Sequence, residues 1–515
     1  MTEVLETPGK TPGRRPWLTL KTLGCFGALV ALLAVTAVAV YVFLIFAAQN
    51  SLRDAIAEAD HLDPAWRLED LEAKRQADMI PWGEDATACV LEVLELIPED
   101  WLSLNPEIRK ADGPFLGKNL EEALDLVAPN ILLGPDFANG LEDEMSELAQ
   151  ALQVAARLSN LSRGRNALEY QDVIFNTLLP NTQNSRKVAR LLKLASFNHA
   201  QRGDLDEALD GCRAIIGVSD SIGDEPFTIS QLVRLSDNLF AAKAFERVLA
   251  QGEPSDSALE RAQHRVVEES KIPFALIAFR GERASFFDVL GKIAREELPI
   301  SALSDRGSSD KKPQAPFAPH GRAFFQYNQG LSLNFLTRAV EIVKLHPHEQ
   351  LAPWKAWEKM TRKPEGWKLY RGAMTYLLLP SIGAFHLAYL RTVALLNVTQ
   401  TMIAMERSRI LLGRWPTSLD EIPRAILPEN PIDPFSGQHV KIARTNDGWI
   451  VYSVGPDGID DGGKLDPRFD RKKERLDWGY QLWDVSERRL LPDLPDDVFQ
   501  NTTEAASTKN LDENP

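Results

Sequence analysis

The feature that most constrains this chain is an uninterrupted apolar run near its N-terminus. Residues 22–48 are 27 consecutive positions without a charge, dominated by leucine, valine, alanine and phenylalanine. As an α-helix rising 1.5 Å per residue, this run spans about 40 Å, whereas the hydrocarbon core of a bilayer is about 30 Å thick. A soluble core helix rarely continues so far without a polar face. We therefore predict a transmembrane helix at residues 22–48, in contact with the lipid bilayer.

Basic residues before the run predict its orientation. The tail carries only two acidic residues and four basic ones, Lys10, Arg14, Arg15 and Lys21. Because basic flanks favour the cytoplasmic side, we expect residues 1–21 to be a cytoplasmic tail. The run is about twice as long as the apolar region of a secretory signal peptide, which favours a retained anchor over a cleaved leader. The predicted location is the bacterial inner membrane, single-pass, with the bulk of the chain periplasmic.

Composition limits the classes of partner and site. The chain has 515 residues, and its 58 basic and 73 acidic residues give a formal net charge of −15, which argues against nucleic acid as a partner. Three cysteines exclude a disulfide scaffold and multi-cysteine metal sites, and the sequence leaves open whether Cys89 and Cys212 pair. Neither a zinc-protease motif nor a nucleophile elbow occurs, so we predict no catalytic or cofactor-binding residue.

Helical periodicity dominates the chain after the apolar run. Residues 49–300 carry apolar residues at three- and four-residue spacing, which predicts a helical domain. Residues 191–209 resemble one tetratricopeptide helix–turn–helix, with Gly203 at the turn and Ala208 where the helices approach. No second copy follows at the 34-residue period. The fold class is therefore predicted to be mainly α, with an irregular helical body that is either solenoid-like or a bundle.

Three further segments follow from composition. Residues 301–322 are rich in serine and proline and lack a helical period, so we expect a flexible loop or linker. Residues 323–394 continue the helical pattern, and a long helix is expected to begin near residue 383 because Pro380 disfavours a helix interior. Residues 486–515 are acidic and poor in large apolar side chains, so we expect a disordered tail.

A different pattern occupies residues 395–485. It contains Gly-Arg-Trp-Pro ending at Pro416, Pro-Ile-Asp-Pro-Phe ending at Phe435, and a predicted β-hairpin over residues 440–453 with an Asn-Asp-Gly turn. Residues 454–463 then interleave aspartate with glycine. Such a loop folds tightly around a hard cation that takes six to eight oxygen ligands, which suits calcium. The alternative is a solvated turn without a metal.

In the order and spacing of these motifs, residues 395–485 resemble the globular head of the type II secretion major pseudopilin. The resemblance implies a small C-terminal α+β pseudopilin-like head whose closing loop binds Ca2+. It places Asp457 at the first acidic ligand, and leaves open which later carboxylates complete the site. The implied metal ligands are Val454, Asp457, Asp460, Asp461 and Asp477.

The chain departs from that family in two ways. A pseudopilin has glutamate five positions beyond its leader glycine, whereas the position five beyond Gly24 is Leu29. About 350 residues also separate the apolar run from residue 395. Filament assembly is therefore not implied. As a whole, the chain resembles single-pass membrane proteins of planctomycete bacteria, a resemblance that implies no activity.

Together these observations predict a membrane-anchored, extracytoplasmic scaffold or protein-interaction protein with an envelope protein as its unidentified partner. Two alternatives stay open. One is an accessory component of a type II secretion- or pilus-like assembly, and the other is a hydrolase acting on envelope material. Between an enzyme and a protein without catalytic activity, the sequence favours the second.

Overall fold

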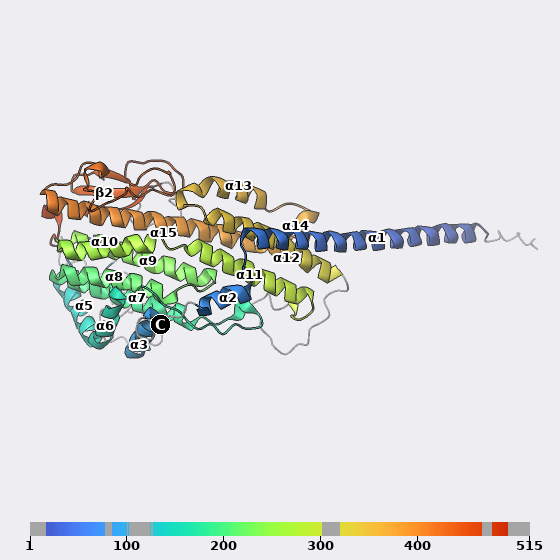
Figure 1. Cartoon of the computed structure of the whole chain (residues 1–515), viewed down its shortest axis with the longest axis horizontal. Coiled ribbons are helices and arrows are strands. Elements are labelled where there is room, and N and C mark those ends of the chain that lie inside the picture. The colour runs from blue at the N-terminus through green and yellow to red at the C-terminus, as the bar shows by residue number, and fades with distance from the viewer. Residues whose placement is uncertain are drawn as a thin grey trace, which may run out of the picture.

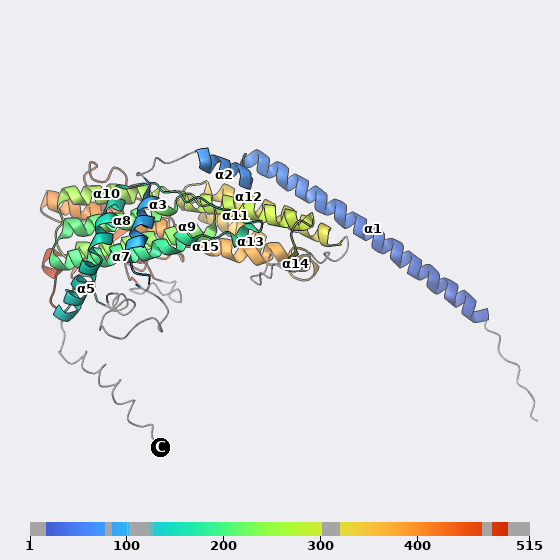
Figure 2. The ribbon, with the colours of Figure 1, turned by 90° about the horizontal axis from the view of Figure 1, so that it is seen from below.

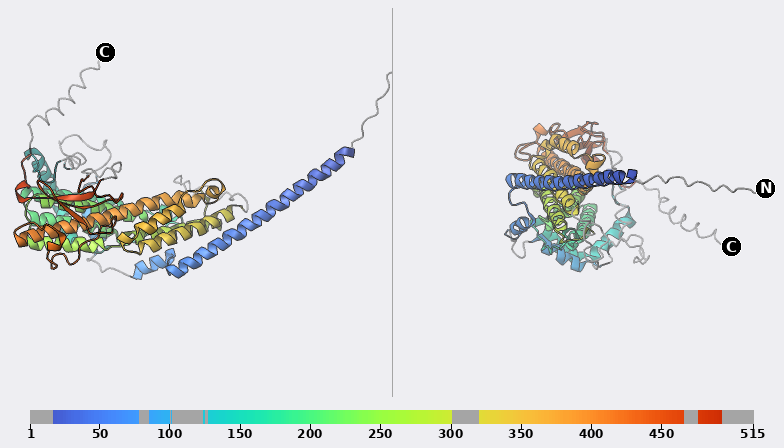
Figure 3. Two further views of the ribbon diagram at one scale, coloured as in Figure 1. Left: turned by 90° about the horizontal axis from the view of Figure 1, so that it is seen from above. Right: turned by 90° about the vertical axis from the view of Figure 1, so that its right-hand side faces the viewer.

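The computed structural model describes residues 17–77, 85–99, 101, 124, 127–300, 320–465 and 476–492. These residues form an elongated, mostly helical body with a small sheet towards one end (Figure 1). One long apolar helix projects beyond the opposite end of the body (Figures 2 and 3). The predicted mainly α class, with a long N-terminal apolar helix, is confirmed.

The element bounds are as follows. The helices are α1 (Trp17–Leu62), α2 (Leu68–Ala77), α3 (Ala86–Leu96), α5 (Pro135–Glu147), α6 (Ala149–Ala155), α7 (Pro180–Arg202), α8 (Leu205–Ile222), α9 (Thr228–Ala250), α10 (Asp256–Ser270), α11 (Phe274–Ala294), α12 (His320–Val343), α13 (Leu351–Thr361), α14 (Trp367–Arg371) and α15 (Ala373–Leu412). The strands are β1 (Lys441–Arg444), β2 (Gly448–Ser453) and β3 (Trp478–Trp483). They form one antiparallel sheet in the order β1-β2-β3.

Helix α1 contains the whole predicted transmembrane run and continues into the body. Most of its large apolar side chains from Phe26 to Phe46 are exposed, at 68% and 60% for these two residues, whereas Tyr41, Leu44 and Ile45 are half-buried. Beyond them, Ala55 and Ala59 are buried, because this half of α1 packs against α12. A Cβ on Gly330 would come within 2.9 Å of the Leu52 backbone, so glycine permits this close approach of the two helices.

The hairpin of α7 and α8 turns where the sequence predicts. Gly203 ends α7 with φ +90°, a left-handed conformation that glycine adopts without steric cost, and Ala208 is fully buried. Pro180 occupies the first turn of α7, where its missing N–H costs no helical hydrogen bond.

Helix α15 is the long spine of the body and is longer than expected. It begins at Ala373 and runs through Pro380, so the expected start near residue 383 is wrong. Packing against α9, α10, β2 and β3 along its length offsets the hydrogen bond that proline removes. Among the described helices, α1 and α15 have the length and apolar composition to cross a membrane, but α15 lies within the body (Figure 1).

The sheet shares its core with the helices. Leu482 of β3 is fully buried, and it belongs to the same apolar cluster as residues of α7, α9 and α15. The Gln481 N–H also donates a hydrogen bond of 3.1 Å to the carboxylate of Glu246 on α9. The C-terminal α+β segment is therefore packed directly onto the helical body.

Residues just after the sheet are also fixed to the body. The Arg488 guanidinium, 2% exposed, donates two hydrogen bonds of 3.0 and 2.8 Å to the buried Glu406 carboxylate on α15. The backbone of Leu490 pairs with Asn130 and Leu132. Residues 486–490, at the start of the segment that the sequence predicts to be disordered, are therefore held against the body.

Two predictions fall wholly or partly outside the described residues. The rest of the acidic tail, residues 493–515, lies outside them. Of the predicted linker at residues 301–322, only the last three positions are described, and they already belong to α12.

A buried carboxylate joins the end of α1 to the body. Asp63, directly after α1, is 3% exposed and accepts hydrogen bonds from Arg280 and Arg283 of α11. Lys344 lies 3.2 Å away, after the end of α12. Burial alone would raise the pKa of Asp63, but the two arginines hold this pKa well below its ordinary value. Asp63 is thus a charged cross-link between α1, α11 and α12.

Replacing Asp63 by alanine should strongly destabilise the body. Asp63→Ala leaves the fully buried Arg283 without its counter-charge, which typically costs about 3–5 kcal/mol. Chemical denaturation of the detergent-solubilised full chain measures this loss. The matched control is Asp420→Ala, which removes an exposed pair with Arg424 and should cost less than about 1 kcal/mol. Equal losses in the two variants would contradict the cross-link.

A second buried carboxylate, Asp237 on α9, predicts a pH dependence. Neither of its oxygens has a hydrogen-bond partner among the described residues, and burial raises its pKa to about 8 despite nearby arginines. The folded state therefore keeps a proton that the unfolded chain releases above its ordinary pKa of about 3.9. The free energy of unfolding should fall as pH rises between these values, by at most about 1.4 kcal/mol per pH unit.

The variant Asp237→Asn should remove this part of the pH dependence. It keeps the shape of the side chain but cannot release a proton. Denaturation of both proteins between pH 5 and 8 should give a shallower fall in stability for the variant. Parallel curves for the two proteins would show that Asp237 does not hold the proton.

Candidate functional site

The predicted calcium loop follows β2, and two of its carboxylates, those of Asp457 and Asp460, have protein partners. The Asp457 carboxylate accepts a 3.0 Å hydrogen bond from the Ile459 N–H within its own exposed turn. The Asp460 carboxylate accepts one of 2.9 Å from the Tyr452 hydroxyl and pairs with the Lys441 ammonium at 2.9 Å. Hydrogen bonds to this carboxylate, chiefly from Lys441, lower the pKa of Asp460.

Asp477 is the buried member of the predicted set. Its carboxylate is 1% exposed, and one oxygen accepts a 2.8 Å hydrogen bond from the Gly463 N–H. The other oxygen is buried without a hydrogen-bond partner among the described residues. Burial raises the pKa of Asp477, and the nearby charges of Asp460 and Asp461 raise it further. The carboxylates of Asp460, Asp461 and Asp477 therefore interact electrostatically. The Asp457 carboxylate instead accepts a hydrogen bond within its own turn.

A calcium ion would fit this arrangement in one respect. One Asp477 oxygen has no hydrogen-bond partner among the described residues, and the charges of Asp460 and Asp461 raise the pKa of Asp477, so a cation there would neutralise their repulsion. In the part of the chain that is described, however, no group of three or more His, Cys, Asp or Glu side chains is placed to hold a metal ion. Val454 is buried, and its N–H donates to Asp433. The calcium site stays a prediction.

Asp433 has a role that the sequence analysis missed. It is 1% exposed and accepts four hydrogen bonds, two of them within its own Pro-Ile-Asp-Pro-Phe turn, from the Phe435 N–H and the Ser436 hydroxyl. The other two come from the Ser453 hydroxyl and the Val454 N–H, at 2.7 and 3.1 Å. One carboxylate thus ties two of the C-terminal motifs together, which explains their residue types structurally.

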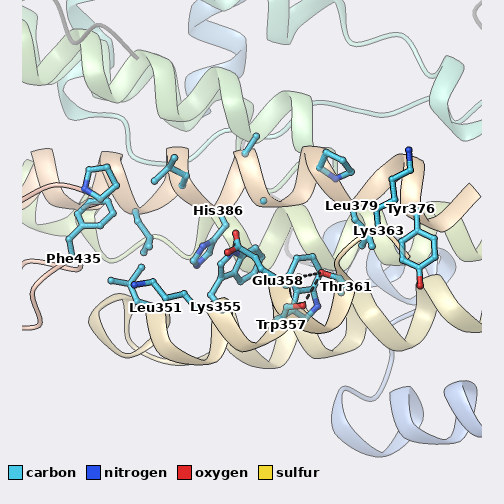
Figure 4. A pocket seen from close by; sticks show the side chains of 17 residues that line it. Leu351, Lys355, Trp357, Glu358, Thr361, Lys363, Tyr376, Leu379, His386 and Phe435 are labelled. Carbon is cyan, nitrogen blue, oxygen red and sulfur yellow. Dashed lines mark hydrogen bonds between the residues drawn. The ribbon is translucent and has the colours of Figure 1, made fainter. Parts of the chain in front are cut away.

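Beside these motifs lies an aromatic groove, a cavity of about 530 Å3 between α13 and α15. Figure 4 shows its labelled side chains between the two helices. Phe435 and Pro456, from the two C-terminal motifs, line it together with residues of both helices. The small residues Gly383 and Ala384 of α15 line it as well and leave room for a ligand.

Stacked rings make the wall of the aromatic groove rigid. The Trp354 ring of α13 stacks on His386 of α15 with centroids 3.7 Å apart, and on Trp357 at 4.7 Å. The His386 imidazole contacts the Gln350 amide oxygen at 3.0 Å. Burial lowers the pKa of His386 to about 3, so the ring is neutral at physiological pH. It therefore acts as a packing group and carries no charge to a ligand.

Charges of both signs line the same groove. Lys355 and Lys363 are exposed, and Glu358 accepts a 3.1 Å hydrogen bond from the Trp354 indole N–H. An apolar cavity with a few charged side chains at its edge suits an apolar or aromatic anchor residue of a binding partner. Sequence reasoning missed this groove because it exists only where α13 lies along α15. The pair Trp354 and Trp357, three residues apart on a helix, was its one visible sign.

Calcium should stabilise the folded protein if the loop binds it. Binding to the folded state alone adds about 2.7 kcal/mol at one hundred times the dissociation constant. The full chain should therefore melt at a higher temperature in millimolar calcium than in chelator, and Asp477→Asn should reduce the difference. The control Asp420→Asn, at an exposed site elsewhere, should keep it. Equal melting temperatures for the unmutated chain would exclude the calcium site.

Comparison with known proteins assigns no family to these sites. No family model matches the chain, and no curated protein or solved structure matches it. The pseudopilin-like character of residues 395–485 accordingly stays a prediction from their motifs.

Proposed function

We propose that this protein is a membrane-anchored, extracytoplasmic scaffold that binds another envelope protein. The observation that supports the anchor is the exposed half of α1, where most of the large apolar side chains are exposed. Leaving a large apolar side chain in water costs about 1.5–3 kcal/mol. Side chains such as Leu33 and Val35, which are 60% and 66% exposed, are therefore more stable in lipid than in water.

The sequence supports the orientation of the anchor. The basic residues before the run favour a cytoplasmic N-terminus, so the body belongs on the periplasmic side of a bacterial inner membrane. The body then begins at the outer surface of the bilayer, because α1 passes without a break from the apolar run into its packed half. A scaffold anchored in this way acts on partners that lie within reach of the membrane.

The aromatic groove supports the binding role. Its wall is held by stacked rings, its floor includes Gly383 and Ala384, and charged side chains line its edge. Preorganised apolar cavities of this kind hold the anchor residues of protein partners, because little conformational entropy is lost on binding. In this proposal the partner inserts an apolar or aromatic side chain between α13 and α15.

Filling the aromatic groove should abolish partner binding without unfolding the protein. A Cβ at Gly383 would meet only the Glu358 carboxylate at 3.9 Å, an ordinary contact, so Gly383→Leu projects into open space. Replacing a helical glycine should also raise stability, by up to about 1 kcal/mol. The measurement uses a photo-crosslinking amino acid at Leu387, which lines the groove, in intact spheroplasts.

We expect crosslinks to one envelope protein from position 387, and their loss in Gly383→Leu with an unchanged or higher melting temperature. A crosslinker at Leu411, exposed on α15 outside the groove lining, is the matched control and should not capture the same protein. Equal crosslinking in the filled and unfilled groove would contradict the binding role.

A further inference from the structure

A second apolar cavity, of about 810 Å3, lies where α1 leaves the body. Its lining comes from α1, from the first turns of α12, and from the region of α14. The residues that matter here are Tyr41, Leu44, Phe324, Trp367, Tyr370 and Met374. Figures 1 and 2 show α14 at the end of the body from which α1 projects.

Large aromatic side chains at this end are exposed. Trp367 and Tyr370 are 62% and 66% exposed, and their rings stack with centroids 5.4 Å apart. Leu377, in the second turn of α15, is 79% exposed. Tryptophan and tyrosine are enriched at membrane–water interfaces, where the ring contacts the acyl region and the polar atom stays hydrated. We call Trp367, Lys368, Tyr370, Arg371 and Leu377 the interfacial patch.

The position of α1 sets the height of this patch. Tyr41 and Leu44 line the same cavity as Trp367 and Tyr370, and both belong to the apolar run of residues 22–48. Leu44 lies four residues before the end of that run, which is about 6 Å along the helix. A bilayer that covers the run therefore brings its headgroup region to the level of α14.

The charge of the patch fits an anionic surface. Residues 362–371 hold four basic residues and one acidic residue, in a chain whose net charge is −15. Lys368, within the patch, is exposed. Arg371 lies over the Tyr327 ring at 3.8 Å. Basic residues beside a transmembrane helix are attracted to anionic phospholipid headgroups.

We propose that the interfacial patch is a second membrane contact, which binds anionic phospholipid headgroups and fixes the height and tilt of the body. This inference rests on the proposed function, in which residues 22–48 span the bilayer. Trp367 and Tyr370 insert at headgroup depth, while Lys368 and Arg371 pair with phosphates. The body is then held at two points, which prevents it from swinging about α1.

The test places spin labels on the full chain in nanodiscs that contain phosphatidylglycerol. Single labels replace Tyr370, Leu411 and Leu33 as cysteine variants, in a Cys25→Ser background, since Cys89 and Cys212 are buried. Leu411 is the matched control, because it is also 66% exposed but lies at the other end of α15. The readout is accessibility to a water-soluble nickel chelate and to membrane-soluble oxygen.

We expect the label at 370 to be several-fold less accessible to the nickel chelate than the label at 411, and more accessible to oxygen. Lys368→Glu, within the patch, should reduce this protection. If 33 is protected in lipid but 370 behaves like 411, the patch does not contact the bilayer, and a protein partner becomes its candidate occupant. If 33 is also accessible to the chelate, the anchor itself is wrong.

Discussion

The Asp63 carboxylate determines how the exposed apolar helix is joined to everything else. It follows α1 directly, and its charge is shared by Arg280 and Arg283 of α11 and by Lys344, the residue after α12. A buried charge of this kind is stable only with all its partners in place, so it favours one arrangement of the three helices. In the proposed anchoring, the same cross-link fixes the body relative to the bilayer, because α1 has no break between its apolar half and its packed half.

Helix α15 connects the end of the body near α12 with the end that holds the sheet. The helix runs the length of the body and contacts α9, α10 and the sheet. Its Glu406 carboxylate binds Arg488, which follows the last strand. Asp433 then links the turn before the sheet to the end of β2. The C-terminal segment therefore depends on the helices for its core. The aromatic groove depends on both, because α13, α15 and the C-terminal motifs each supply part of its lining.

Local patterns were predictable and long-range contacts were not. The apolar run, the Gly203 turn and the β1–β2 hairpin follow from residue type and spacing alone. The third strand pairs with β2 across an intervening segment, and local residue spacing does not predict such a long-range pairing. The helix start predicted near residue 383 is wrong, because packing along α15 outweighs the one hydrogen bond that Pro380 removes. Of the predicted site residues, Asp460, Asp461 and Asp477 lie near one another. The aromatic groove could not be predicted from the sequence, because residues far apart in the chain form it.

The central claim is that α1 crosses a membrane and leaves the whole body on its outer side. Cysteine labelling in right-side-out spheroplasts tests it most directly, with a membrane-impermeant maleimide and a Cys25→Ser background. A cysteine at Leu411, exposed at the far end of α15, should label in intact spheroplasts. A cysteine at Lys10 should label only after the membrane is permeabilised. Labelling of position 10 in intact spheroplasts, with position 411 protected, would contradict the account.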